Sequence, residues 1–140
     1  MQVFKLTSGY DMPALGLGTW QLRGEICTSA VRTALDLGYA HLDTAEAYRN
    51  HEAIRAALKG YDRDRIFITS KIPPSELRHD DVLAMGNRAL KELGVEYLDL
   101  LLIHWPNEEI PIAETLGAMA LLVKQGKVRS IGVSNFMIPH

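Results

Sequence analysis

The amino-acid sequence predicts an α/β fold in which short parallel strands alternate with amphipathic helices. Five strand-like runs occupy residues 14–18, 40–44, 66–70, 98–104 and 130–134, and their starts are about 26 to 32 residues apart, the length of one strand–helix unit. The runs are almost continuously apolar, as strands buried on both faces are. Apolar residues at helical spacing fill each gap between the runs. Such a series folds as an open doubly wound sheet or as a closed barrel.

The first glycine pair separates these two folds. Gly16 and Gly18 follow the first run, but the third glycine of a G-x-G-x-x-G dinucleotide fingerprint falls on Gln21, so the fingerprint is absent. The sequence therefore favours a (β/α)8 barrel of the TIM type. Because such a barrel needs about 250 residues and the chain has 140, we expect a barrel truncated after about five strands. Residues 3–6 and 10–13 flank a Thr-Ser-Gly turn and predict an N-terminal β-hairpin.

The four predicted helices each end at a glycine, and the first three have a candidate capping residue at their start. Thr28 or Ser29 is expected to cap the first helix, and Asn50 the second. Asp80 or Asp81 is expected to open the third. The glycines expected to end the four helices are Gly38, Gly60, Gly94 and Gly126.

Composition and charge narrow the class of protein. The length suits one domain, and 47% hydrophobic with 23% charged residues is an ordinary globular composition. A net charge of −2 gives no electrostatic reason to expect nucleic acid or an anionic membrane as partner. Cys27 is the only cysteine, which suits a reducing compartment. The first residues have no signal-peptide character, so we expect a cytoplasmic protein.

Four ionisable residues are expected at one rim, because the carboxyl ends of parallel strands meet there. Asp43 lies at the end of the second run, and Tyr48 follows five residues later. Lys71 and His104 come at the ends of the third and fourth runs. Taken alone, each has an ordinary structural explanation: a helix cap, a rim-covering ring, a surface lysine or a packed histidine. Their joint placement favours a reactive site.

The four groups suit protonation of a carbonyl oxygen. An isolated phenol is a weak acid at neutral pH, but the Lys71 ammonium would stabilise the Tyr48 phenolate, and Asp43 would hold Lys71 in place. His104 would orient the substrate oxygen by a hydrogen bond. Hydride delivery to the carbonyl carbon requires a cofactor, and a nicotinamide is implied.

Four segments resemble those of a known family. Residues 38–48, GYAHLDTAEAY, resemble the first aldo-keto reductase signature, and residues 127–136, KVRSIGVSNF, resemble its second. Residues 97–106, YLDLLLIHWP, are similar to the strand that carries the family's catalytic histidine. Residues 16–20, GLGTW, resemble its opening strand and loop. The resemblance covers essentially the whole chain and is strongest to small bacterial reductases of the 2,5-diketogluconate reductase type.

The resemblance implies that residues 1–140 are the N-terminal portion of a single aldo-keto reductase barrel domain. The implied activity is NADPH-dependent reduction of aldehydes and ketones to alcohols, with Tyr48 as general acid, Lys71 and Asp43 tuning it, and His104 orienting the carbonyl. The implied partner is a small carbonyl substrate, with no nucleic acid and no membrane. The cofactor, NADPH or NADP+, is expected to contact Gly18, Thr19, Trp20, Asp43, Ser134 and Asn135. The residues implied in substrate binding are Trp20, Tyr48, His104 and Trp105.

The sequence departs from the family just after Tyr48. The family usually has a small residue, an asparagine and two acidic residues there, whereas this chain has Arg49, Asn50, His51 and Glu52. The His-Glu pair does not begin an H-E-x-x-H zinc motif, because position 55 is Arg55. No metal ion is expected.

Two alternatives to a working reductase remain open at the level of sequence. One is a non-catalytic binding or regulatory module on the same scaffold. The other is that the 140-residue chain is inactive by itself, since a barrel missing strands leaves exposed sheet edges. The full-length form is expected to be a monomer, and the short chain is expected to self-associate or to need its missing half.

Overall fold

The computed structural model describes residues 1–137, whose strands form two sheets. An antiparallel hairpin consists of β1 (Val3–Lys5) and β2 (Asp11–Pro13), as predicted. The second sheet is parallel and five-stranded, with the order β3-β4-β5-β6-β7. Its strands are β3 (Leu17–Gly18), β4 (His41–Asp43), β5 (Phe67–Ile72), β6 (Leu98–Ile103) and β7 (Val128–Val133).

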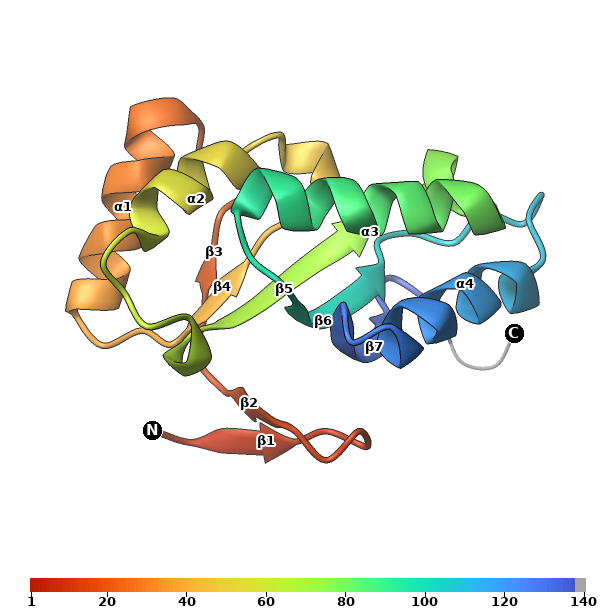
Figure 1. The fold of residues 1–140 in the computed structure, drawn as a ribbon, viewed down its shortest axis with the longest axis horizontal. Coiled ribbons are helices and arrows are strands. Elements are labelled where there is room, and N and C mark those ends of the chain that lie inside the picture. The colour runs from red at the N-terminus through yellow and green to blue at the C-terminus, as the bar shows by residue number, and fades with distance from the viewer. Residues whose placement is uncertain (138–140) are drawn as a thin grey trace.

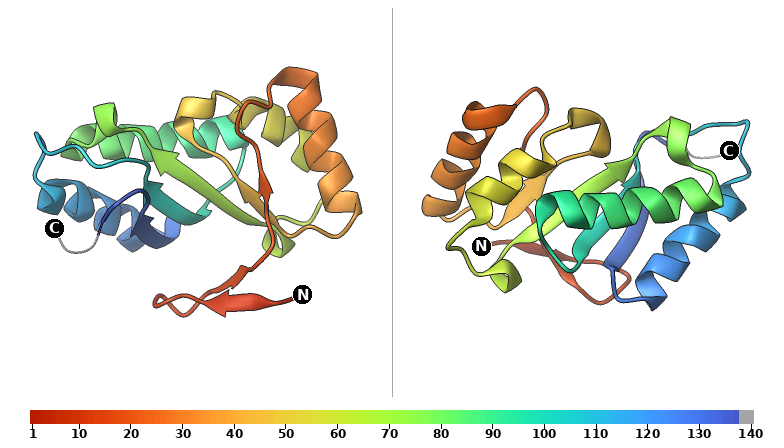
Figure 2. Two further views of the ribbon diagram at one scale, coloured as in Figure 1. Left: turned by 180° about the vertical axis from the view of Figure 1, so that it is seen from behind. Right: turned by 45° about the horizontal axis from the view of Figure 1, so that its top comes forward.

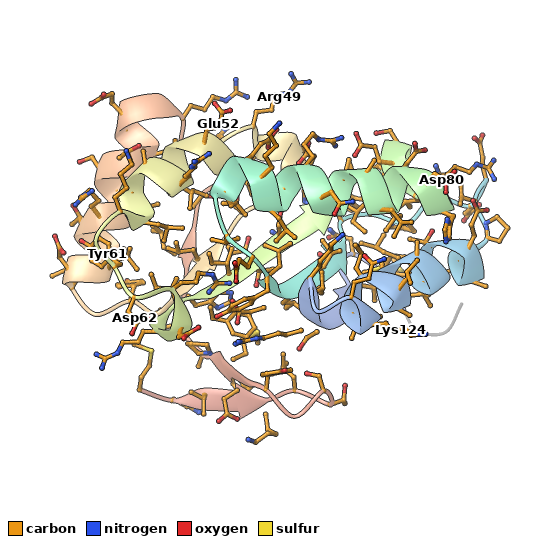
Figure 3. The ribbon with its side chains drawn as sticks, in the orientation of Figure 1. Arg49, Glu52, Tyr61, Asp62, Asp80 and Lys124 are labelled. Atoms are coloured by element: carbon orange, nitrogen blue, oxygen red, sulfur yellow. The ribbon has the colours of Figure 1, made fainter. Side chains whose placement is uncertain are left out.

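The helices alternate with these strands and cover one face of the parallel sheet (Figures 1 and 2). Charged side chains such as Arg49, Glu52, Asp80 and Lys124 extend away from the core (Figure 3). The α-helices are α1 (Gly24–Asp36), α2 (His51–Leu58), α3 (His79–Leu93) and α4 (Ile112–Lys124). Three short 3-10 helices are η1 (Glu46–Tyr48), η2 (Arg63–Arg65) and η3 (Pro74–Glu76).

The strand order tests the barrel, which the sequence favours, against the doubly wound sheet. In a doubly wound sheet the order reverses at a switch point, and helices cover both faces. Here each strand pairs with the next one in the chain, and the helices lie on a single face (Figure 2). This is the arrangement of a (β/α)8 barrel followed over its first strands, so the predicted fold class is confirmed.

The hydrophobic core lies between the sheet and the helical layer. Strand residues such as Leu42, Ile68 and Leu101 are fully buried there, as are Ile54 of α2 and Met85 of α3. Removal of a large apolar side chain from water contributes about 1.5–3 kcal/mol. The inward side chains of α1 follow helical spacing and are Cys27, Val31 and Ala34.

Two of the predicted helix starts are wrong. Helix α1 begins at Gly24, one turn before Thr28, and the Thr28 hydroxyl donates instead to the Ala53 carbonyl of α2 at 2.9 Å. Helix α3 begins at His79, so Asp80 and Asp81 lie inside its first turn. Carboxylates are favourable there because of the helix dipole, which explains their presence without a capping role.

The predicted helix ends are confirmed. Gly94 is the C-cap of α3 with a φ of +67°, and Gly38 follows the last turn of α1 with a φ of +92°. Both angles lie in the left-handed region, where glycine avoids the clash that a Cβ atom would cause.

The hairpin packs beneath the amino ends of the strands, away from the predicted rim (Figure 1). The His41 Nδ1 atom lies 3.3 Å from the Pro13 carbonyl oxygen, and the Arg129 guanidinium lies 5.2 Å from the Tyr10 ring centre. One end of the sheet is therefore covered by the chain itself. In residues 1–137, no helix is both long and apolar enough to span a membrane.

Candidate active site

The register of the parallel strands brings the predicted residues to one end of the sheet. Asp43 is the last residue of β4 and pairs with Gly18 of β3 and Thr69 of β5. Lys71 lies inside β5 rather than after it, since that strand continues to residue 72. His104 directly follows β6, and its backbone N–H donates to the Ile72 carbonyl at 2.9 Å. Three consecutive strands therefore present these side chains at their carboxyl ends.

Lys71 is a buried cation with two oxygen partners. Its side chain is only 8% exposed. The ammonium donates to the Asp43 carboxylate at 2.5 Å and to the Thr44 carbonyl at 2.9 Å. A buried ammonium is tolerated only when it is paired and hydrogen-bonded, so this ion pair fixes the position of the charge.

Tyr48 lies beside this ion pair on η1. The Lys71 Nζ atom is 5.2 Å from the centre of the Tyr48 ring, within the range of cation–π attraction. The His104 ring packs edge-on against Tyr48, with 5.7 Å between ring centres. The turn that places Tyr48 ends at Arg49, whose φ of +52° is left-handed. A non-glycine residue in that region is strained, and such strain is concentrated at functional sites.

The electrostatic environment keeps His104 neutral. Burial, and then the nearby Lys71 ammonium, lower the pKa of His104, while the Asp43 carboxylate opposes the shift. A neutral imidazole has one N–H donor and one acceptor nitrogen. His104 can therefore donate a hydrogen bond near neutral pH without adding a second positive charge beside Lys71.

Trp20 and Trp105, the tryptophans predicted to bind substrate, differ in their contacts with this cluster. Trp105 stacks on His104 with 6.4 Å between ring centres, and it is half exposed. Trp20 follows β3 and is two-thirds exposed. Both offer uncovered aromatic surface.

A buried polar network supports the turn, and the sequence did not predict it. Asn50 precedes α2 as expected, but its side chain does not cap the helix. Its amide donates to the carbonyls of Thr19 and Leu22 and accepts from the Thr44 hydroxyl. The Thr19 hydroxyl in turn donates to the Asp43 carbonyl at 3.0 Å. These bonds tie the loop after β3 to the segment that carries Tyr48. An asparagine beside a helix start was the only sequence signal, and it favoured a cap.

The residues predicted to hold a cofactor lie at the ends of β3 and β4 and in the loops that follow β3 and β7. Thr19 is buried after β3, beside Gly18, where no atom lies within 4 Å of a would-be Cβ. Ser134 follows β7, and its backbone N–H donates to the Ile103 carbonyl at 2.8 Å. Asn135 has a φ of +62°, and its amide donates to the His104 carbonyl at 2.8 Å. The second loop is thereby connected to the cluster.

Comparison with known proteins places this arrangement in a family. The sequence model of the aldo/keto reductase family matches residues 14–140. The chain belongs to the aldo/keto reductase family. The match includes all four residues of the rim cluster.

Relatives within the family are closely similar over part of their length. An aldo-keto reductase of Mycolicibacterium smegmatis is 44% identical in an alignment of 138 positions that covers 96% of this chain and 50% of that protein. A methylglyoxal reductase of Escherichia coli O157:H7 is 41% identical over 132 residues, covering 91% of this chain and 49% of that protein. The chain spans about half the length of the curated relatives that it matches.

Solved structures of the family share the same fold. A thermostable aldo-keto reductase in complex with the inhibitor epalrestat superposes with a TM-score of 0.92 at 46% identity, covering 97% of this chain and 54% of that chain. A Bombyx mori aldo-keto reductase in complex with NADP has a TM-score of 0.88 at 31% identity, covering 96% and 50%. The hairpin and the five parallel strands are therefore the aldo/keto reductase fold over about half of its length.

Proposed function

We propose that the protein containing this chain is a cytoplasmic, NADPH-dependent reductase of aldehydes and ketones. Residues 1–140 form the N-terminal portion of its single barrel domain. The observation that carries the proposal is the ion pair of the buried Lys71 with Asp43 at 2.5 Å, with the Tyr48 ring against the ammonium and His104 against that ring. The glyoxal and methylglyoxal reductases among the relatives support a small carbonyl substrate.

The two loops at the rim suit a nicotinamide. The open space above Gly18 lets a flat ring approach the backbone at the end of β3. The amide N–H of Asn135 is used by the His104 carbonyl, which leaves the Asn135 side-chain oxygen to accept from a carboxamide, beside the Ser134 hydroxyl. The residues proposed to hold the cofactor are Gly18, Thr19, Trp20, Asp43, Ser134 and Asn135.

The geometry of the cluster supports the following proposed roles. Bound NADPH supplies a hydride for the carbonyl carbon. The Tyr48 hydroxyl donates its proton to the carbonyl oxygen, so the C=O bond becomes a C–O–H group. Lys71, held by Asp43, stabilises the phenolate left on Tyr48. The neutral His104 donates a hydrogen bond that orients the carbonyl. Trp20 and Trp105 form apolar walls for the substrate.

Removal of the Tyr48 hydroxyl tests this assignment. In the full-length protein, Tyr48→Phe should lower kcat for methylglyoxal by about 10²- to 10⁴-fold, the usual contribution of a general acid. The ring remains, so packing against His104 and cofactor affinity should change little. The measurement is NADPH oxidation followed by absorbance, with cofactor binding followed by fluorescence.

The matched control is Tyr10→Phe, which removes a hydroxyl from the exposed hairpin and should leave kcat unchanged. Wild-type turnover in the Tyr48→Phe variant would overturn the role of Tyr48. Absence of turnover by the wild type on a broad aldehyde panel, with intact cofactor binding, would favour a regulatory module instead.

A further inference from the structure

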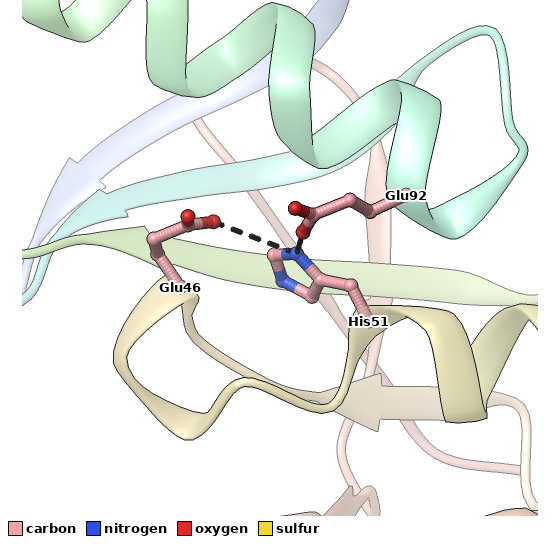
Figure 4. A group of neighbouring side chains, drawn as sticks. All are labelled: Glu46, His51 and Glu92. Atoms are coloured by element: carbon pink, nitrogen blue, oxygen red, sulfur yellow. Dashed lines mark hydrogen bonds and ion pairs between the residues drawn. The ribbon is translucent and has the colours of Figure 1, made fainter.

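A second group of ionisable side chains lies outside the four-residue cluster. Glu46 comes from η1, His51 from the first turn of α2 and Glu92 from the last turn of α3. Figure 4 shows the three side chains converging, and one ligand atom from each lies within 4.8 Å of the others. We propose that Glu46, His51 and Glu92 bind a divalent transition-metal ion of the zinc class.

The spacing of the donor atoms fits such an ion. The Nδ1 atom of His51 lies 3.1 Å from Glu92 Oε2 and 3.6 Å from Glu46 Oε2. In a tetrahedral zinc site, ligands about 2.1 Å from the ion lie about 3.4 Å from one another. The two distances from Nδ1 therefore match a zinc site to within a few tenths of an ångström, and all three donor atoms lie within 4.8 Å of one another.

His51 is oriented for this role by a second hydrogen bond. Its side chain is only 2% exposed, and its Nε2 atom lies 3.0 Å from the hydroxyl of the buried Ser70. Without an ion, Nδ1–H can donate to Glu92 at 3.1 Å. With an ion bound, Nε2–H would donate to Ser70, and the lone pair of Nδ1 would face the ion between the two carboxylates. Metal-binding histidines are held in this way, with the other ring nitrogen donating to a neighbouring oxygen.

Glu46 has one carboxylate oxygen to spare. Its Oε1 atom accepts from the Arg88 guanidinium at 2.7 Å. Its Oε2 atom is buried and, within the part of the chain that the structure describes, has no hydrogen-bond partner. A buried carboxylate oxygen without a hydrogen-bond partner is unusual and calls for a reason. A bound cation supplies one, and Arg88 fixes the carboxylate with this oxygen turned toward His51.

The surroundings attract a cation and admit water. A cavity of about 660 Å³ adjoins the three residues, which form part of its wall. Three protein ligands and a water-accessible fourth position are typical of zinc sites that are not enclosed. A histidine among the ligands favours a transition metal over calcium or magnesium, which prefer oxygen alone. The acidic side chains of the wall are Glu46, Glu52, Glu76 and Glu92, and the basic ones besides His51 are Arg49 and Arg88.

Direct titration tests the site. Zinc chloride is added to the purified protein in competition with a chelating zinc indicator, and we expect one ion bound per chain. His51→Asn and Glu92→Gln should each weaken zinc binding at least tenfold. An asparagine amide can still donate to Glu92, and Glu92 is one-third exposed, so both variants are expected to fold. Circular dichroism checks this directly.

The matched control is His79→Asn, because His79 is an exposed histidine beside a single carboxylate, that of Asp80, at 2.9 Å. It should bind zinc as the wild type does. Zinc should also raise the thermal midpoint of the wild type, since an ion that binds only the folded state stabilises it, and this rise should be lost in His51→Asn. No saturable binding, or equal affinity in all variants, would overturn the proposal. Neither readout depends on reductase activity.

Discussion

Burial lowers the pKa of two histidines of this chain, but the groups that surround them differ. At the rim, the Lys71 ammonium assists burial in lowering the pKa of His104. At the amino end of β4, His41 lies between the Pro13 carbonyl and the Thr69 hydroxyl, which is 2.9 Å from Nε2. Burial lowers the pKa of His41, against smaller opposing effects led by its hydrogen bond to Pro13. One histidine is neutral where a substrate would lie, and the other is neutral inside the fold.

His41 should make the protein less stable in acid. Its pKa in the folded state lies below the ordinary value of 6.5, so the unfolded chain takes up a proton first as the pH falls. The stability contributed by the neutral ring is thus present above pH 6.5 and is lost as the pH falls through the folded-state pKa. His41→Gln should therefore lose less of its thermal midpoint than the wild type between pH 7.5 and pH 5.

The control for this comparison is His79→Gln, since His79 is half exposed on α3. It should keep the acid loss of the wild type. If His41→Gln and His79→Gln showed the same loss as the wild type, the acid sensitivity would lie elsewhere. Thermal melting followed by circular dichroism is sufficient for all three proteins.

Among the elements, β6 is joined to its neighbours by one buried carboxylate. Asp99 accepts from the Ile68 backbone N–H of β5 at 2.9 Å, from Arg63 of η2 at 2.7 Å and from Arg129 of β7 at 3.4 Å. The guanidinium groups of Arg63 and Arg129 both contact the Tyr97 ring, at 4.1 and 3.8 Å from its centre. Asp99 therefore connects three strands at the end of the sheet opposite the rim.

Asp99→Ala should lower the free energy of unfolding by about 1–3 kcal/mol, because it leaves the buried Ile68 N–H without its acceptor and removes the carboxylate that pairs with the partly exposed Arg63 and Arg129. Urea unfolding measures the change. Asp11→Ala is the matched control, since it breaks the Lys5–Asp11 pair, both of whose side chains are more than half exposed. That variant should stay within about 0.5 kcal/mol of the wild type. Equal effects of the two substitutions would contradict the role of Asp99.

The elements also show which parts of the fold a sequence can predict. The series of strands and the rim positions of Asp43 and His104 could be predicted from local patterns. Apolar strand runs and the glycines that end helices can each be recognised within a short segment of sequence. The start of α1 did not, since Thr28 bonds to α2 rather than capping its own helix. Likewise, the Asn50 amide donates to a carbonyl in the loop after β3. His51 of α2 forms a hydrogen bond with Glu92 of α3. Contacts between distant segments leave no periodic pattern in the sequence.

At the scale of the whole molecule, helices cover one face of the sheet, and the sheet has two edge strands, β3 and β7. On β7, Ile131 and Val133 are two residues apart and lie on the same face, with exposures of 37% and 45%. Trp20 and Trp105 add further uncovered aromatic surface. The relatives are about twice as long as this chain. Their additional residues are long enough to cover an edge strand and a sheet face of this size.

An edge strand with exposed apolar side chains favours association with another chain. We therefore expect the purified 140-residue chain to self-associate in a concentration-dependent way, and the double variant Ile131→Lys, Val133→Lys to shift its mass toward the monomer. Light scattering coupled to size exclusion measures this. Ile26→Lys places a lysine on the exposed face of α1, where Ile26 is 71% exposed, and should leave the mass distribution unchanged. A wild-type chain that is monomeric at every concentration, or an Ile26→Lys variant that dissociates as readily, would remove β7 as the associating edge.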